Sequence, residues 1–177
     1  MRVVLVTPHW PPRASGHGDY SWHLTHSLRE AGADISVLVL GQDDVDESID
    51  SAISVTGIDF PDSPKRMRAV VKAVAALRPD VVCLQFEANA YRLKAFPHLL
   101  PAALRMKGLR VVLMYHELWA PSRLGRPAKF ALLNAPSRVV AFSQWHAQGM
   151  HRFRKIGPPV DIIAVATNIL RPELGDL

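Results

Sequence analysis

The chain has 177 residues, the usual size of one domain and enough to bury a substantial core. Its apolar fraction of 49% and charged fraction of 21% are those of an ordinary globular protein and exclude extensive disorder. The single cysteine, Cys83, excludes an intramolecular disulfide framework and favours the reducing cytoplasm. No apolar stretch approaches the roughly 18 residues of a membrane span, and we expect the first residues to form a strand rather than a signal peptide.

Charge is unevenly distributed along the chain. Residues 41–62 carry seven acidic groups and no basic one, whereas residues 63–177 carry 18 basic and 6 acidic groups. We interpret the acidic run as a solvated loop. The excess of basic groups in residues 63–177 can serve solubility, or it can attract an anionic substrate, an anionic membrane surface or nucleic acid. Nucleic acid is disfavoured because the basic residues are dispersed, without interleaved aromatic residues or a known binding motif.

Short apolar runs rich in β-branched residues alternate with amphipathic helical patterns. The runs lie at residues 3–6, 35–40, 81–84, 111–114, 139–142 and 162–165, with a weaker candidate at 53–55. Helical spacing of apolar residues is found at 20–31, 67–77, 93–104 and from 144 onward. Repeated strand–helix–strand units predict a parallel sheet with right-handed crossovers. We therefore predict a single doubly wound, Rossmann-like α/β domain with a mostly parallel sheet of six to seven strands.

The loop after the first predicted strand is the most specific element, because ligands of such sheets bind beyond the carboxyl ends of the strands. Residues 7–20 read TPHWPPRASGHGDY, and Gly16 and Gly18 would let the backbone approach a ligand closely. The helix that follows would present free amide hydrogens to phosphate. A nicotinamide dinucleotide site is disfavoured because Ser21 replaces the third glycine and no acidic residue ends the second strand.

Several motifs, in this order, resemble those of family 4 glycosyltransferases with the GT-B fold. They are Val-Thr-Pro-x-x-Pro-Pro…Gly-x-Gly-Asp-Tyr-Ser at 6–21, Arg-Pro-Asp-Val-Val with Gln-Phe-Glu at 78–87, Tyr-His-Glu at 115–117, the strand ending in serine at 139–143, and the segment 162–169. The resemblance implies an amino-terminal, acceptor-side domain at 1–170 and the start of an interdomain linker at 171–177. A separate donor-binding domain would then be required, and we expect this chain alone not to transfer sugar.

The resemblance also implies two sets of site residues. Those expected to bind the acceptor or the donor diphosphate are Gly16, Gly18, Asp19 and Ser143. The alternatives are an ordinary tight turn for the two glycines and helix capping for Asp19 and Ser143.

Catalytic roles fall on His116, Glu117 and Glu87. His116 would face the interdomain cleft and bond the donor sugar or diphosphate, as donor, acceptor or cation; the alternative is a capped core histidine. Each glutamate would act as acid, base or hydroxyl-positioning carboxylate, and a structural role is equally open for both.

We expect no metal and no cofactor. His17, His23 and His26 could gather beside one helix, but no carboxylate or cysteine partner is evident nearby. The expected partners are a nucleotide-sugar, bound only with a complementary domain or subunit, and a sugar, lipid-linked or small-molecule acceptor. The basic, proline-bearing segment 91–110 could lie on an anionic membrane at the inner face, or form a core helix. A non-catalytic or membrane-recruiting subunit of the same fold is the alternative function.

Overall fold

A seven-stranded, entirely parallel sheet organises the domain, in the order β3-β2-β1-β4-β5-β6-β7. The computed structural model describes residues 1–42, 45, 52–92, 96–116, 125–151 and 157–164. The strands are β1 (Arg2–Thr7), β2 (Asp34–Leu40), β3 (Ser54–Ile58), β4 (Val81–Phe86), β5 (Val111–Tyr115), β6 (Arg138–Ala141) and β7 (Val160–Ile162). The helices are α1 (Gly16–Glu30), α2 (Pro64–Ala76), α3 (Phe96–Met106), α4 (Gly125–Asn134) and α5 (Gln144–His151). The predicted fold class is confirmed.

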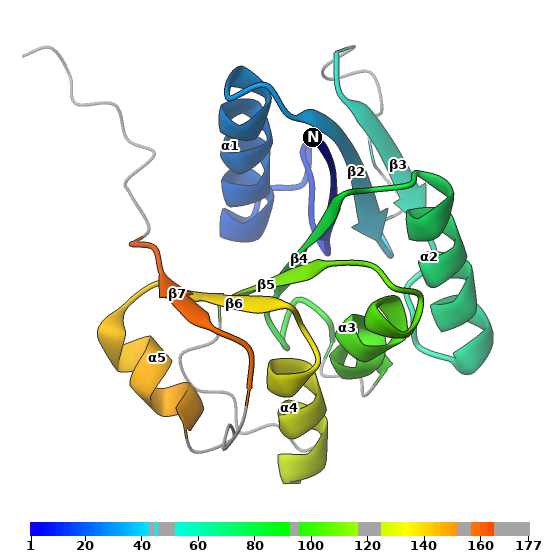
Figure 1. The fold of residues 1–177 in the computed structure, drawn as a ribbon. Coiled ribbons are helices and arrows are strands. Elements are labelled where there is room, and N and C mark those ends of the chain that lie inside the picture. Colours follow the sequence, from blue (N-terminus) through cyan, green and yellow to red (C-terminus); the bar gives the residue numbers. More distant parts are fainter. Residues whose placement is uncertain (43–44, 46–51, 93–95, 117–124, 152–156, 165–177) are drawn as a thin grey trace, which may run out of the picture.

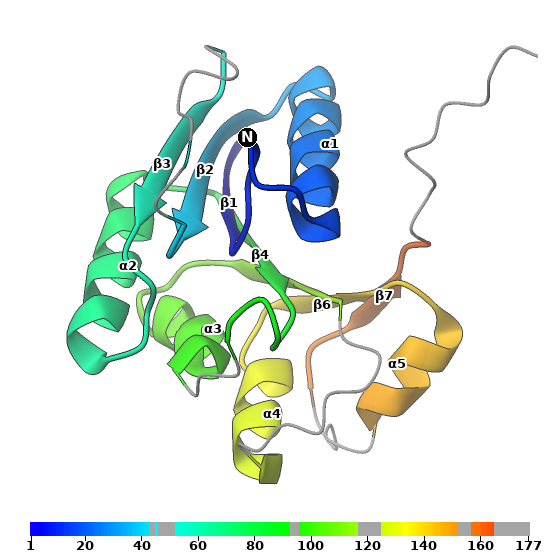
Figure 2. The ribbon, with the colours of Figure 1, turned by 180° about the vertical axis from the view of Figure 1, so that it is seen from behind.

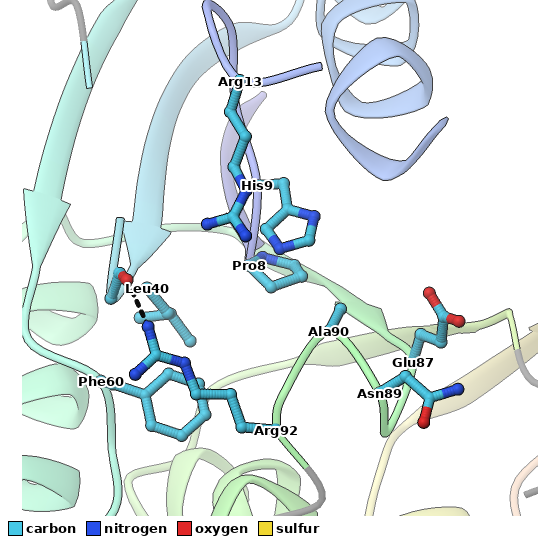
Figure 3. A pocket seen from close by; sticks show the side chains of 10 residues that line it. Pro8, His9, Arg13, Leu40, Phe60, Glu87, Asn89, Ala90 and Arg92 are labelled. Carbon is cyan, nitrogen blue, oxygen red and sulfur yellow. Dashed lines mark hydrogen bonds between the residues drawn. The ribbon is translucent and has the colours of Figure 1, made fainter. Parts of the chain in front are cut away.

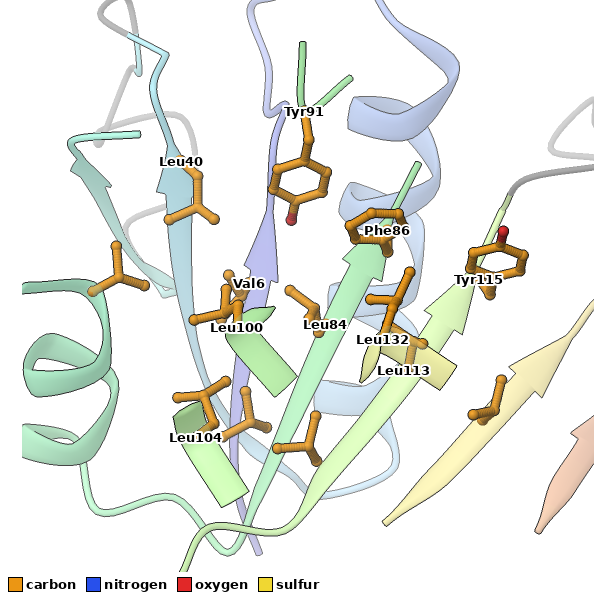
Figure 4. Close-up of a cluster of buried hydrophobic side chains, with 14 of the residues drawn as sticks. Val6, Leu40, Leu84, Phe86, Tyr91, Leu100, Leu104, Leu113, Tyr115 and Leu132 are labelled. Carbon is orange, nitrogen blue, oxygen red and sulfur yellow. The ribbon is translucent and has the colours of Figure 1, made fainter. Parts of the chain in front are cut away.

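Helices cover both faces of the sheet, as Figures 1 and 2 show from opposite sides. On the face of α2 and α3, alternate residues of the central strands, such as Val6, Leu84 and Leu113, pack against helix residues including Leu100 and Leu104 (Figure 4). All five of these side chains are fully buried. Because the central strands β1, β4 and β5 are apolar on both faces, the continuous runs seen in the sequence follow directly.

On the opposite face, α1 packs over the other set of strand residues. Leu5, Val37 and Val39 are fully buried there, and Trp22 and Leu28 of α1 lie against them. Cys83 belongs to the same cluster, and burial raises the pKa of its thiol to about 12, so the thiol stays protonated at neutral pH. Its predicted role as a small core residue is confirmed.

Element boundaries differ from the sequence prediction in several places. Helix α1 begins at Gly16 rather than near residue 20, and β7 occupies Val160–Ile162, two to three residues earlier than expected. The weak strand candidate is real and extends to Ile58 as β3. No helix was predicted before β6, yet α4 forms there; Pro127 is compatible with it because proline is tolerated in a first helical turn.

Of the two alternatives for segment 91–110, a membrane-surface segment or a core helix, the core helix is what the structure shows where it describes this segment. Leu100, Leu104 and even Pro101 of α3 are buried against the sheet. Its basic neighbour Arg105 donates to the carbonyl of Leu109 at 3.1 Å. Among the described residues, no helix is both long and apolar enough to cross a bilayer.

Candidate functional site

The site lies where the strand order changes direction. Strand β1 pairs with β2 on one side and with β4 on the other, so the segments that leave β1 and β4 diverge at the carboxyl edge of the sheet. Doubly wound sheets bind ligands at this switch point. The segments concerned are residues 8–15 after β1 and residues 87–92 after β4.

The segment after β1 is held in place by a buried tryptophan. Trp10 is fully buried; its backbone N–H donates to Gln42 Oε1 at 2.9 Å, and Gln42 Nε2 donates back to the Trp10 carbonyl at 2.8 Å. At the base of the segment, the hydroxyl of Thr7 donates to the His9 carbonyl at 3.0 Å. These bonds fix the segment on the end of β2, so the side chains that follow are positioned before any ligand arrives.

Ser15 caps helix α1. Its Oγ accepts from the Gly18 N–H at 2.9 Å and shares a hydrogen bond with His9 Nδ1 at 3.1 Å. Gly16 and Gly18 therefore lie inside the first helical turn, which corrects the expectation that they belong to a loop or tight turn. A Cβ on Gly18 would approach Ser15 Oγ at 3.1 Å and the Arg13 carbonyl at 3.3 Å, so this glycine permits close packing of the segment on the helix.

Asp19 is not the helix cap, because Ser15 occupies that position. Asp19 is exposed in the first turn, and its backbone N–H bonds the Ser15 carbonyl at 3.0 Å. A carboxylate there interacts favourably with the positive end of the helix dipole. Asp19 remains free to serve as a ligand residue, since its side chain points out of the core.

His116 follows β5 and lies against the first turns of α1. Its ring packs edge-on against His17 and Tyr20, with centroid distances of 4.3 and 5.1 Å, and lies 4.5 Å from the ring of Phe142. His116 Nε2 bonds Gln85 Oε1 at 2.5 Å, and the amide of Gln85 is itself fully buried. The prediction that the glycine-bearing segment and His116 meet at one edge of the sheet is confirmed.

His116 is neutral at physiological pH. Burial, helped by the charges of His17 and His146, lowers its pKa to about 3. This corrects the expectation that it could carry charge, because an exposed histidine titrates near pH 6.5 and this one is largely enclosed. Since Gln85 Oε1 can only accept, Nε2 carries the proton and the lone pair at Nδ1 is left to accept a hydrogen bond.

Glu87 and His17 form the link between the two segments. His17 Nε2 and Glu87 Oε2 are 2.7 Å apart, with 11% and 32% of the two side chains exposed. Burial lowers the pKa of His17, while the carboxylate of Glu87 opposes that shift. Nδ1 of His17 is buried without a hydrogen-bond partner among the described residues. The pair therefore orients Glu87 and leaves its second oxygen available for a ligand hydroxyl.

A cavity of about 320 Å³ opens beside this pair (Figure 3). Its volume lies at the lower end of the range for small-molecule sites, about 300–1,000 Å³. The ends of β1 and β2 and the segments after β3 and β4 form its walls. The lining residues are Pro8, His9, Arg13, Leu40, Gly41, Phe60, Glu87, Asn89, Ala90 and Arg92.

Tyr91 folds the segment after β4 back over the sheet. The Tyr91 side chain is fully buried, stacks on Phe86 at 5.1 Å, and donates its hydroxyl to the Gln85 carbonyl at 2.8 Å. Arg92 follows in the left-handed region, with φ of 54°, which is uncommon for a residue other than glycine. This conformation brings Arg92 to the cavity, where its guanidinium lies over the Phe60 ring at 5.5 Å.

The predicted site residues thus divide into three groups. Glu87 and His116 lie at the switch point, and the first turn of α1 lies beside them. Ser143 caps α5, its Oγ accepting from the His146 N–H at 3.1 Å, as the alternative interpretation proposed. Glu117 lies outside the described residues.

Sequence analysis missed several residues of the site. They are His9, Arg13, His17, Gln85 and Arg92. Gln85 could have been found as a polar residue ending an apolar strand. His9, Arg13, His17 and Arg92 could not be found this way. They come together only because the segment after β1 packs beside the segment after β4, about 75 residues later in the sequence.

The three histidines that the sequence analysis considered and disfavoured as a metal site have separate surroundings. His17 pairs with Glu87, His26 Nδ1 bonds the Trp22 carbonyl at 2.8 Å, and His23 is exposed. Across the part of the chain that the structure describes, no group of three histidine, cysteine, aspartate or glutamate residues could hold a metal ion.

Together, the all-parallel sheet and the helices on both of its faces define a Rossmann-like α/β domain, with a cavity at the switch point of the sheet. The sequence model for Glycosyltransferase Family 4 matches residues 14–168, and the chain therefore belongs to that family. Membership implies a nucleotide-sugar donor and an acceptor. Among solved structures, the chain is similar to sucrose-phosphate synthase from Thermosynechococcus elongatus, with a TM-score of 0.66 and 13% identity over 95% of this chain and 91% of that one. At that identity the likeness concerns the fold. A comparison with curated proteins finds no match.

Proposed function

We propose that this domain is the acceptor-binding half of a glycosyltransferase. The observation that supports this most directly is the meeting of His17, Glu87 and His116 beside the cavity, at the sheet edge where a second domain could close. Glu87 belongs both to the cavity wall and to the pair with His17. A molecule in the cavity would therefore lie close to His17 and to His116, which packs against it.

In this proposal the cavity holds the acceptor and a second domain or subunit holds the nucleotide-sugar. Neutral His116 accepts a hydrogen bond at Nδ1 from a hydroxyl of the donor sugar, because its Nε2 donates to Gln85 Oε1. The oxygen of Glu87 that His17 leaves open orients the acceptor hydroxyl. Closure of the two domains aligns donor and acceptor and excludes water, which contributes to the rate enhancement.

The first test is nucleotide-sugar binding to the isolated chain by calorimetry and NMR. We expect at most weak binding, with chemical-shift changes confined to the first turn of α1 and His116. Submicromolar binding would contradict the division of labour, because it would mean that this domain already contains a complete donor site.

The second test joins the chain to the donor-binding domain of a family 4 enzyme of known donor and measures release of nucleoside diphosphate. Substitution His116→Ala should abolish turnover, whereas His23→Ala, an exposed histidine of α1, should leave it unchanged. If the folded fusion binds donor but turnover is insensitive to His116, the catalytic proposal fails. A non-catalytic subunit of the same fold then becomes the better interpretation.

A further inference from the structure

The cavity is lined mainly by positive groups. Arg13 and Arg92 enter it from opposite sides, with the ring of His9 beside Arg13 (Figure 3). Glu87 is the one carboxylate among the described lining residues, and it lies 2.7 Å from His17. The negative charge of Glu87 therefore faces His17, whose ring packs against His116, rather than Arg13 and Arg92.

The two guanidinium groups act on the same small volume. The pKa of His9 falls to about 4, first because the ring is partly buried and then because of the positive charges of Arg13, His17 and Arg92. Arg13 and Arg92 are separated by almost 80 residues in sequence, yet both influence this ring. Their fields therefore overlap inside the cavity.

This positive charge has no protein counterpart in the described residues. No carboxylate among them lies within ion-pair distance of Arg13 or Arg92. Arg92 is instead held by the Phe60 ring and by a 3.4 Å hydrogen bond from Nη2 to the Gly41 carbonyl. These contacts orient the guanidinium and leave its charge unbalanced, which favours an anionic occupant.

We propose that the acceptor bound in this cavity carries a phosphate ester, held between Arg13 and Arg92 and contacted by His9. This inference rests on the proposed function and adds the chemical class of the acceptor. A carboxylate has two oxygens on one edge, which a single guanidinium can bind in bidentate fashion. A phosphate has oxygens in a tetrahedral arrangement, so it can bond two guanidinium groups that approach from opposite sides. The remaining part of the acceptor lies toward Asn89 and Glu87.

The test measures binding of inorganic phosphate to the full chain at constant ionic strength, by calorimetry and by NMR of the His9 ring. Arg13→Gln and Arg92→Gln should each weaken binding about tenfold, since each removes a charge-assisted hydrogen bond. The matched control is Arg68→Gln, which removes the same charge from an exposed position on α2 and should leave affinity within about twofold. Circular dichroism verifies that all three variants are folded.

Phosphate should also raise the pKa of His9, because a bound anion favours the protonated ring. An equal loss of affinity in Arg68→Gln would overturn the proposal by showing that binding depends on net charge alone. Acetate binding as tightly as phosphate, or an unchanged pKa of His9, would also overturn it.

Two competitors distinguish the source of the phosphate. Displacement of inorganic phosphate by glucose 6-phosphate supports a soluble phosphorylated acceptor, and displacement by phosphatidylglycerol vesicles, but not phosphatidylcholine vesicles, supports a lipid head group. Displacement by neither overturns the assignment of the cavity to the acceptor. If the two-domain fusion transfers sugar to uncharged acceptors and the chain does not bind phosphate, the phosphate inference is refuted and the proposed function stands. If the chain binds phosphate but turnover of the fusion does not depend on His116, the proposed function is refuted and the phosphate site stands.

Discussion

Acidification should destabilise the domain through His116. The pKa of this histidine is about 3 in the folded chain and about 6.5 when unfolded. Because the folded value is lower, the stabilising contribution is complete above about pH 6.5 and is lost as the pH falls toward 3. Between pH 7.5 and pH 5 the unfolded chain takes up a proton at this position and the folded chain does not. At 1.36 kcal/mol per unit, the loss is on the order of 2 kcal/mol.

Urea denaturation of the wild type and of His116→Gln at pH 7.5 and pH 5 isolates this contribution. The glutamine can retain a hydrogen bond to Gln85 but does not titrate, so its free energy of unfolding should change less between the two pH values, by about 2 kcal/mol. The partly buried ring of His9 and the ring of His17 add to the acid sensitivity of both proteins, and the charge of His17 also acts on His116, so the comparison reports His116 together with this coupling. His23→Gln, at an exposed position of α1, should behave as wild type. An identical pH dependence in the wild type and His116→Gln would refute the reasoning.

Three further substitutions test the surroundings of the site. Ser15→Ala removes the cap of α1 and should cost about 1 kcal/mol in urea denaturation; no loss relative to Ser27→Ala, at an exposed position of α1, would contradict the capping role. Gly41→Ala should lower the melting temperature, because φ is 69° and the new Cβ would come within 2.7 Å of Phe60 Cβ. Its combined cost should exceed about 1 kcal/mol, and an unchanged melting temperature would count against that packing. Glu87→Gln should lower the pKa of His17 further, because the carboxylate raises it; NMR titration of the ring measures this, and an unaltered value would exclude the pair.

The fold could be predicted largely from hydrophobic periodicity. Continuous apolar runs identified the buried strands because both of their faces are covered. Strand β3 gave a weaker signal since it contains Thr56 and Gly57 and is partly exposed. Helix α4 was not predicted; it contains Gly125 and Pro127, two residues that disfavour helix interiors, and both fall in its first turn.

The candidate site could be predicted only in outline. The resemblance to family 4 motifs named His116 and Glu87, and because both follow parallel strands, their position also fixed which edge of the sheet they reach. Their chemistry could not be predicted in the same way. The neutrality of His116 depends on enclosure by Tyr20 and Phe142, and the approach of Arg92 depends on how the buried Tyr91 folds its segment back.

The outermost strands of the described sheet have a consequence for solubility. A parallel sheet leaves unpaired amides and carbonyls along each outer strand, and these can recruit strands from other molecules. Here β7 has three residues, and its Asp161 is paired with Arg138 of β6 at 2.9 Å. On the other margin, β3 has five residues and includes Gly57. Short, charged or glycine-containing margins are poor templates for intermolecular pairing, so we expect the folded domain to resist fibril-like self-association.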